Sequence, residues 1–405
     1  MTFRTVRLGD ACSTVSGGTP PRTRYECFGG PVPWVKITDM LQGSVCTTEE
    51  TLSEVGLASC SAKLLPAGTV LISVFATIGR TAVLAIPAAT NQAIAGVVPL
   101  DPRSLDSSFL RYFLDSKRPH LIREARGVAQ PNINQSILRD LELPLLPMAE
   151  QLRIVDLLSR AEGIVRLRGQ AQQKAAELIP ALFADMFGDP ATNPKGWPQL
   201  TLGELIADGP TNGLYKHKSA YGSGTPILRI DAFYAGRITD LASLKRLQVD
   251  IDEQRRFALA AGDIIVNRVN SPEYLGKSAL VPALLEPTVF ESNMMRFSID
   301  AERALPEFVI ALLQDPSSRR HFLANAKHAI NQSSINQQDV KALPIFAPPL
   351  DLQRRFTQRV ASVLAIEQQQ QAAMAKAEAT FRSLLARAFT EAGPQVHREM
   401  ERALA

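Results

Sequence analysis

The nearest approach to a catalytic motif is the run SPEYLGKSA at 271–279. Its Gly276, Lys277 and Ser278 match the end of the phosphate-binding loop G-x-x-x-x-G-K-S, but serine stands where that loop begins with glycine. The loop depends on several glycines because its backbone amides wrap around phosphate groups. A related run, ATIGRTA at 76–82, lacks the same glycine. We therefore do not expect nucleotide hydrolysis.

Other catalytic and metal-binding patterns are also missing from the sequence. It has no G-x-S-x-G run, no H-E-x-x-H run and no Asp/Asn-Pro-Pro-aromatic run of an amino-methyltransferase, and its five histidines lack metal-ligand spacing. The four cysteines include no C-x-x-C pair and are expected to be reduced thiols: Cys12, Cys27, Cys46 and Cys60. We expect no catalytic residue, no metal site and no cofactor in this chain.

Basic, aromatic and amide side chains gather instead in polar loops. Arg and Lys suit phosphate anchoring, while Asn and Gln suit hydrogen bonds to base edges. Any one of these residues is also typical of a solvated surface loop, and Trp34 and Trp197 are expected to be packing residues. Because the clusters occur at matched places in two parts of the chain, they favour nucleic-acid binding. The candidate DNA-binding residues are Arg22, Arg24, Tyr25, Lys36, Arg80, Asn91 and Gln92 in the first part, and Tyr215, Lys216, His217, Lys218, Arg229, Arg268, Asn270, Lys277 and Asn293 in the second.

The two parts are copies of one another. The run QPNINQSILRDLELPLLP at 130–147 returns as QSSINQQDVKALPIFAPP at 332–349, an offset of 202 residues. The run LPAGTVLIS at 65–73 returns as LAAGDIIVN at 259–267, and Asn91 is matched to Asn293. A period this long indicates two copies of one domain rather than a solenoid. The scaffold runs match well and the polar loops match poorly, so the copies are expected to recognise two different sequences.

Each copy changes character along its length. Short apolar runs bounded by Gly and Pro predict strands, followed by helical patterns near 107–125 and 306–326. Residues 149–187 and 351–390 then predict long helices, in which eight of ten positions on a 3.5-residue repeat are apolar. A helix of about 35 residues spans on the order of 50 Å.

The two long helices are expected to pack on each other, because the apolar stripe of each is rich in Ala and too narrow to stabilise a single isolated helix. A plain structural hairpin on a globular core is the alternative. Pro180 lies inside the first helical run and lacks an amide donor, so it predicts a kink or break there.

The overall composition and net charge are compatible with DNA binding but do not by themselves indicate it. The chain has 405 residues, 45% of them hydrophobic, and a net charge of +4, so a DNA-binding role needs locally concentrated charge or partners that share the task. The opening MTFRTVRLGD has no apolar signal core, and no apolar run is long enough to span a bilayer. We expect a cytoplasmic protein without a membrane partner.

The ordered, duplicated runs resemble the specificity subunits of type I restriction–modification systems. The resemblance covers nearly the whole chain and rests on runs such as SGGTP…GGPVPWVKITDM, LAAGDIIVNRV…GKSALV, the pair quoted at 130–147 and 332–349, and DMFGDPATNPKGWPQLTLGEL at 185–205. It implies that each domain reads one half of a split double-stranded DNA site, and that an antiparallel helix pair sets the spacing. It further implies two partner methyltransferase subunits that use S-adenosylmethionine, and in some systems motor–nuclease subunits.

The resemblance fixes the expected architecture. The fold class is α/β (α+β), a tandem duplication of a mixed α/β target recognition domain, each followed by a long helix, with the two helices pairing as an antiparallel coiled coil. The expected boundaries are 1–147 for recognition domain 1, 148–188 for spacer helix 1, 189–349 for recognition domain 2, 350–393 for spacer helix 2 and 394–405 for a tail. A Gln and an Arg recur where each helix begins, and the expected partner-binding residues are Gln151, Arg153, Gln353 and Arg355.

Two other functions remain open from the sequence. A scaffold or adaptor would bind proteins through its helices without reading bases. An enzyme fused from two catalytic domains is the least favoured, because neither copy offers an acid–base or nucleophile set.

Overall fold

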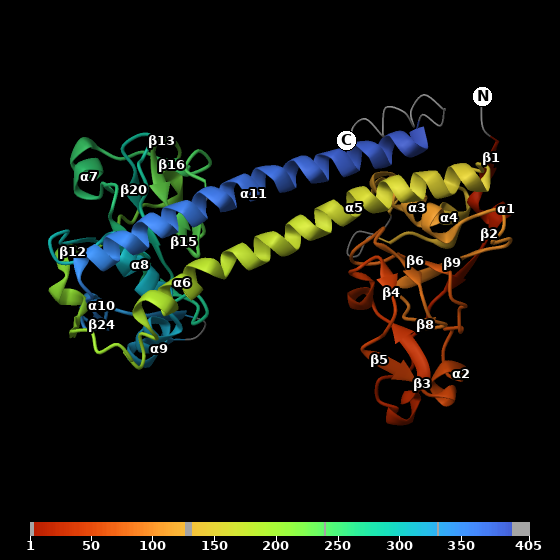
Figure 1. The fold of residues 1–405 in the computed structure, drawn as a ribbon, viewed down its shortest axis with the longest axis horizontal. Helices are drawn as coiled ribbons and strands as arrows, with labels where there is room; N and C mark the ends of the chain where they lie inside the picture. The colour runs from red at the N-terminus through yellow and green to blue at the C-terminus, as the bar shows by residue number, and fades with distance from the viewer. Residues whose placement is uncertain (1–3, 126–131, 239, 330–331, 391–405) are drawn as a thin grey trace. The chain divides into compact units, whose positions relative to one another are not determined.

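The computed structural model describes residues 4–125, 132–238, 240–329 and 332–390 (Figure 1). Gln130 of the first repeated run and the expected tail 394–405 lie outside these residues. The chain forms two compact units: one takes the residues up to Gln170 together with those from Gln371 onward, and the other takes Ala171–Gln370. Each unit therefore contains parts of both long helices.

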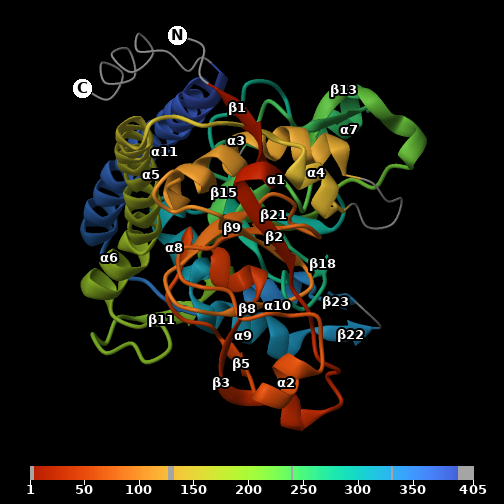
Figure 2. The same ribbon diagram turned by 90° about the vertical axis from the view of Figure 1, so that its right-hand side faces the viewer.

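The first unit is built on two small sheets and a two-stranded ribbon. The five-stranded sheet has the order β2-β9-β6-β7-β4, the three-stranded sheet has the order β5-β3-β8, and β1 pairs antiparallel with β10. In Figure 2, β2 and β9 run beside each other across this unit. The strands are β1 (Thr5–Arg7), β2 (Cys12–Ser16), β3 (Phe28–Val35), β4 (Ser44–Val45), β5 (Glu50–Leu52), β6 (Val70–Ser73), β7 (Thr81–Leu84), β8 (Ala89–Thr90), β9 (Ile94–Pro99) and β10 (Glu142–Pro144).

The second unit repeats this topology. Its larger sheet has the order β12-β21-β17-β19-β15-β14, its smaller sheet β16-β13-β20, and β11 pairs antiparallel with β24. Only β14 and the small β18-β23-β22 sheet are additional among the described strands. The strands are β11 (Gln199–Thr201), β12 (Ile206–Asn212), β13 (Tyr221–Leu228), β14 (Phe233–Tyr234), β15 (Gly236–Ile238), β16 (Lys245–Leu247), β17 (Ile264–Asn267), β18 (Val269–Asn270), β19 (Ser278–Leu280), β20 (Val289–Phe290), β21 (Met294–Ile299), β22 (Lys327–Ala329), β23 (Gln332–Ser334) and β24 (Pro344–Phe346).

Helices pack on the sheets and continue into the long helical runs. Those of the first copy are α1 (Leu8–Ala11), α2 (Glu54–Ala58), α3 (Ser107–Glu124), α4 (Gln135–Arg139), α5 (Met148–Ala176) and α6 (Leu178–Phe187). Those of the second copy are α7 (Ile251–Arg256), α8 (Pro306–Gln314), α9 (Pro316–Asn325), α10 (Gln337–Lys341) and α11 (Leu350–Thr390). The mixed α/β duplication expected from the sequence is thus confirmed.

The first helical run breaks where the proline predicts. α5 ends at Ala176 and α6 begins at Leu178, with a turn at Glu177 between them. Pro180 has no amide to donate to Ala176, and its ring crowds that carbonyl, so the break falls just before the proline. The second run has no proline and continues as one helix of 41 residues.

Each unit includes the end of the helical run that follows the other copy. In the first unit, Phe389 near the end of α11 lies 5.3 Å from Phe109 of α3, between ring centroids. In the second unit, Phe187 at the end of α6 lies 4.9 Å from Phe308 of α8. These four rings occupy equivalent positions, so the repeat extends to the last turn of both helical runs.

One pairing expected from the sequence is wrong. Asn91 was matched to Asn293, but the Asn91 amide donates to Val35 O at 3.0 Å and the Glu291 amide donates to Leu228 O at 3.1 Å, at the ends of equivalent strands. Asn91 therefore corresponds to Glu291. Asn293 has the place of Ala93, because each accepts, through its carbonyl, the amide of the first residue after a buried strand.

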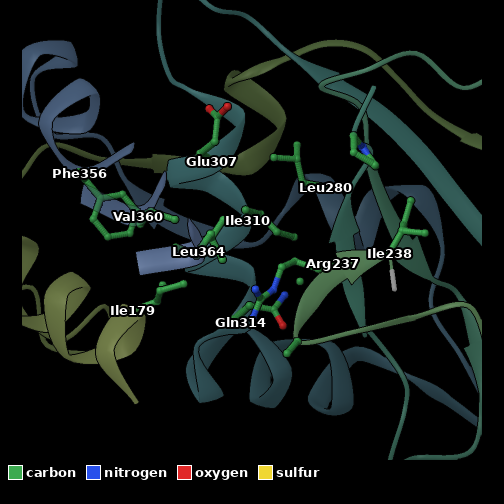
Figure 3. A pocket seen from close by; sticks show the side chains of 14 residues that line it. Ile179, Arg237, Ile238, Leu280, Glu307, Ile310, Gln314, Phe356, Val360 and Leu364 are labelled. Carbon is green, nitrogen blue, oxygen red and sulfur yellow. The ribbon is translucent and has the colours of Figure 1, made fainter. Parts of the chain in front are cut away.

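The copies differ in how they fill one region beside the long helices. In the first unit, Arg111 of α3 donates to Glu162 of α5 at 2.6 and 3.1 Å, and the Tyr112 hydroxyl donates to the same carboxylate at 2.8 Å. The equivalents in the second unit are Ile310, Ala311 and Leu364, which line an apolar cavity of about 300 Å³ (Figure 3). The exchange of Tyr for Ala leaves this space open.

No helix among the described residues is long and apolar enough to cross a membrane.

Candidate nucleic-acid interface

The repeated Asn of the two INQ runs caps a short helix in each unit. Asn134 Oδ1 accepts the Ile137 amide at 3.0 Å at the start of α4. Asn336 Oδ1 accepts the amides of Gln338 and Asp339 at 2.7 and 3.1 Å at the start of α10. An amide oxygen at this position satisfies backbone donors that have no partner inside the helix. The repeated Asn is therefore explained by local structure.

In the first unit, two candidate DNA-binding residues, Arg22 and Lys36, form one charged cluster beside β3. Arg22 donates to Glu50 at 2.6 Å, and its guanidinium lies 5.0 Å from the Trp34 ring. Lys36 donates to Glu49 at 2.6 Å and to Glu50 at 2.9 Å. The hydrogen bonds from Arg22 and Lys36 hold the pKa of Glu50 below its usual value. Trp34 is buried, as expected for a packing residue.

The remaining candidates of the first unit lie in adjoining turns. Arg24 is paired with Glu26 at 2.8 Å, and Tyr25 is 86% exposed. Asn91 accepts the Ala93 amide at 3.1 Å, and Gln92 accepts a hydrogen bond from Thr19. Arg80 is half-buried and directly follows the turn at Gly79.

The second unit carries a charged cluster beside β13, in which one cation, but not its carboxylate, is equivalent to that of the first unit. Arg229, which corresponds to Lys36, donates to Glu291 at 3.2 Å. Lys216 is paired with Glu253 at 2.7 Å. Tyr215 is 78% exposed, and the exposed pair His217 and Lys218 begins the turn before β13. Both units thus present cations that are paired with carboxylates. A phosphate group of DNA can replace the carboxylate as the partner of such a cation.

The segment between β17 and β19 carries Arg268, Asn270 and Lys277, and the last candidate, Asn293, directly precedes β21. Arg268 Nη1 donates to Ser292 O at 3.1 Å, while its Nε is buried without a hydrogen-bond partner. Asn270 accepts the Ser271 amide at 2.8 Å, and Asn293 accepts the Arg268 amide through its backbone carbonyl.

Lys277 is half-buried, and its ammonium is held by groups of the protein. Its Nζ donates to Ile230 O at 2.6 Å and lies 4.1, 4.6 and 5.4 Å from the centroids of Tyr234, Phe233 and Tyr274. Burial lowers the pKa of this ammonium. Such an environment suits a side chain that holds the loop together more than one that reaches for DNA.

Two of the expected partner-binding residues are structural clamps. Gln151 and Gln353 are fully buried. Gln151 Nε2 donates to Leu146 O at 2.8 Å and its Oε1 accepts the Asp106 amide at 2.9 Å. With no surface left, neither glutamine can contact a partner directly. Arg153 and Arg355 are exposed.

Sequence reasoning missed two sets of residues, one inside these clusters and one on the short helices α4 and α10. Glu50 and Glu291 hold the cations of β3 and β13, and nothing in their local sequence marks them. Arg139 and Lys341 end the two short helices, and their signal was present, because they are separated by the same 202 residues as the INQ runs. Within the described residues no group of His, Cys, Asp and Glu side chains could hold a metal ion.

Comparison with known proteins gives a consistent family. Residues 2–176 match the type I restriction modification DNA specificity domain. The EcoKI specificity subunit of Escherichia coli K12 is 25% identical over 382 residues, 88% of this chain and 82% of the relative. The MjaIX specificity subunit of Methanocaldococcus jannaschii is 27% identical over 213 residues, 47% of this chain and 49% of the relative.

Solved structures share the fold along the whole chain. The S subunit of a type I restriction–modification system from M. genitalium superposes with a TM-score of 0.56 at 14% identity, covering 97% of each chain. A chain from a structure of type I R-M complex assembly and conformational transition superposes with a TM-score of 0.62 at 18% identity, covering 96% of this chain and 98% of that one. The domain matched by residues 2–176, the relatives that align along most of the chain and the shared fold agree, so the chain is similar to the DNA specificity subunits of type I restriction–modification systems.

Proposed function

We propose that this chain recognises a bipartite double-stranded DNA site, with the domain of residues 1–147 reading one half and the domain of residues 189–349 reading the other. The observation that supports this most is the repeat of one sheet topology with different polar loops. A scaffold kept the same in both copies fixes the geometry, while loops that differ supply different contacts to base edges.

The candidate interface in each unit is the charged cluster on β3 or β13. Lys36 and Arg229 are equivalent cations, each held by a carboxylate at 2.6–3.2 Å. Phosphate or a guanine edge can take over such a cation, and the freed carboxylate can accept from a cytosine amino group. Exposed Tyr25 and Tyr215 lie beside these clusters in sequence and supply apolar or hydroxyl contacts.

The two long helical runs act as the spacer, pairing as an antiparallel coiled coil. Within the first unit, residues of α5 and of the end of α11 share one core, which includes Ile154, Leu158, Leu384 and Ala388. A Cβ built on Gly169 would lie 4.0 Å from Met374 Cε. Later residues of α5 thus meet earlier residues of α11, which supports the antiparallel direction.

The spacer also docks partners in this proposal. Two methyltransferase subunits bind along the helices and bring S-adenosylmethionine, and motor–nuclease subunits join where the system encodes them. Arg153 and Arg355 remain the candidate docking residues, because both are exposed at the start of a long helix. The complex works in the cytoplasm, where its DNA lies.

Methylome sequencing of the host with and without the gene tests the function. We expect one bipartite methyladenine motif that disappears with the gene. An identical set of methylation motifs in both strains would contradict the proposal.

A further inference from the structure

We propose that the side chains which recur on α4 and α10, Gln135 with Arg139 and Gln337 with Lys341, form a phosphate-binding site in each unit that holds the DNA backbone without reading its sequence. The inference rests on the proposed function and adds a ligand class and residues to it. Neither site belongs to the charged clusters on β3 and β13.

The two sites are built in the same way. Each lies on a five-residue helix capped by Asn. A Cβ added to Gly9 would lie 3.0 Å from Arg139 Cβ, and one added to Gly203 would lie 3.0 Å from Lys341 Cβ. A glycine at the start of each domain therefore lets the backbone approach the basic residue closely, which fixes where that residue stands.

The cations at these sites are not neutralised, unlike those of the β3 and β13 clusters. Arg139 donates to Thr14 at 2.8 Å and to Gln135 at 2.6 Å, both uncharged groups. Within the residues that the structure describes, neither Arg139 nor Lys341 forms an ion pair. Asp339, the acidic residue of α10, is engaged with the Asn336 amide at 2.7 Å. Arg139 is exposed and Lys341 is half-buried, and a solvent-accessible cation without a carboxylate partner retains its attraction for a phosphate.

In the second unit the site is a polar hollow open to solvent. It is lined by two cations and four amides: Arg268, Lys341, Asn212, Asn336, Gln337 and Gln338. No carboxylate lines it, and the Nε of Arg268 is buried without a hydrogen-bond partner. Amide N–H groups beside guanidinium and ammonium groups suit a phosphodiester, which offers only acceptors.

Both sites adjoin the loop that carries other candidate DNA contacts. The Ile335 amide donates to Arg268 O at 2.9 Å, and the Ile133 amide donates to Val74 O at 3.2 Å. The INQ run therefore connects each loop directly to α4 or α10. A duplex that lies on the loop is within reach of the site, and the repeat of the same Gln and cation in both copies matches a contact that is independent of sequence.

A salt titration of the full-length chain on a random-sequence 40-base-pair duplex tests this. Arg139→Ala and Lys341→Ala should each reduce the slope of log affinity against log salt by about 0.9, the value for one phosphate contact, and the double variant by about twice that. Arg139→Lys and Lys341→Arg should keep the wild-type slope. Arg160→Ala and Arg354→Ala, which remove exposed cations of the long helices paired with Asp156 and Asp351, serve as matched controls and should also keep it.

The outcomes separate this inference from the proposed function. If wild type binds the duplex and the Ala variants keep its slope, the phosphate sites are refuted while the function stands. If the variants change the methylated motif itself, the residues read bases and the inference is overturned. If wild type does not bind the duplex and deletion leaves the methylome unchanged, the proposed function fails. Equal melting temperatures for the variants and wild type will show that folding is unaffected.

Discussion

Gln151 and Gln353 hold the same place in the two copies, each fastening the start of a long helix to the recognition domain before it. Each donates through Nε2 to a backbone carbonyl five residues earlier at 2.8 Å, and each accepts, through Oε1, the amide of a residue just before a domain helix. The side chains are fully buried, so these bonds have no solvent to replace them.

Loss of either clamp should destabilise its own unit. Gln151→Ala or Gln353→Ala leaves a buried amide and carbonyl unsatisfied, which costs about 2–3 kcal/mol. Urea unfolding measures the loss, with the exposed Gln369→Ala as control. Wild-type unfolding combined with loss of methyltransferase copurification would instead support direct docking.

The cavity beside Ala311 should accept a larger side chain. Ala311→Leu buries more apolar surface in existing space and should raise the free energy of unfolding by about 0.5–2 kcal/mol. In the first unit the same position is filled, and Tyr112→Ala should lower the free energy of unfolding by about 3–5 kcal/mol. Thermal unfolding checks both. A lower melting temperature for Ala311→Leu would show that the cavity walls do not fit the added group.

Asp115 should make stability depend on pH. Burial raises the pKa of Asp115 to about 6, against the opposing effects of Arg111 and of the Thr81 hydroxyl, which donates to it at 2.6 Å. A carboxyl with a raised folded-state pKa stabilises the fold fully below about pH 4 and loses that contribution as pH rises through about 6. Asp115→Asn should therefore melt progressively higher relative to wild type between pH 4 and 7. A difference in melting temperature that stays constant over this range would contradict the assignment.

Lys277 should matter for stability and not for sequence recognition. Lys277→Met removes the bond to Ile230 O and the contacts with three rings, which should cost about 1–2 kcal/mol. The methylated motif should stay the same in both halves. Lys218→Met, at an exposed position, is the control for stability. A changed second half of the motif would return Lys277 to the DNA-binding residues.

The repeat made the fold predictable, because matched runs at nearly constant offset require matched strands and helices. It did not predict which side chains fill the space between elements. Tyr112 and Ala311 are both compatible with a helix, but Tyr112 packs against α5 whereas Ala311 leaves a cavity. The match of Asn91 to Asn293 failed because the two equivalent short loops each contain an Asn, but at positions two residues apart. Only backbone hydrogen bonds distinguish them.

The candidate interface was predictable as a region and less so residue by residue. Polar loops at turns were identified from residue types, but the partners of each cation lie far along the chain, as Glu291 does from Arg229. Gln151 shows the converse. A repeated polar residue at a helix start suits docking and clamping equally, and only burial distinguishes them.

Exchange of one recognition domain tests the central claim most directly. Residues 1–147 would be replaced by the corresponding domain of a specificity subunit with a known motif, and the methylome of the host would be sequenced. Bipartite recognition predicts that one half of the methylated motif changes to that of the donor. The half that is read by residues 189–349 should keep its bases. A motif that is unchanged, or one that changes in both halves, would contradict it.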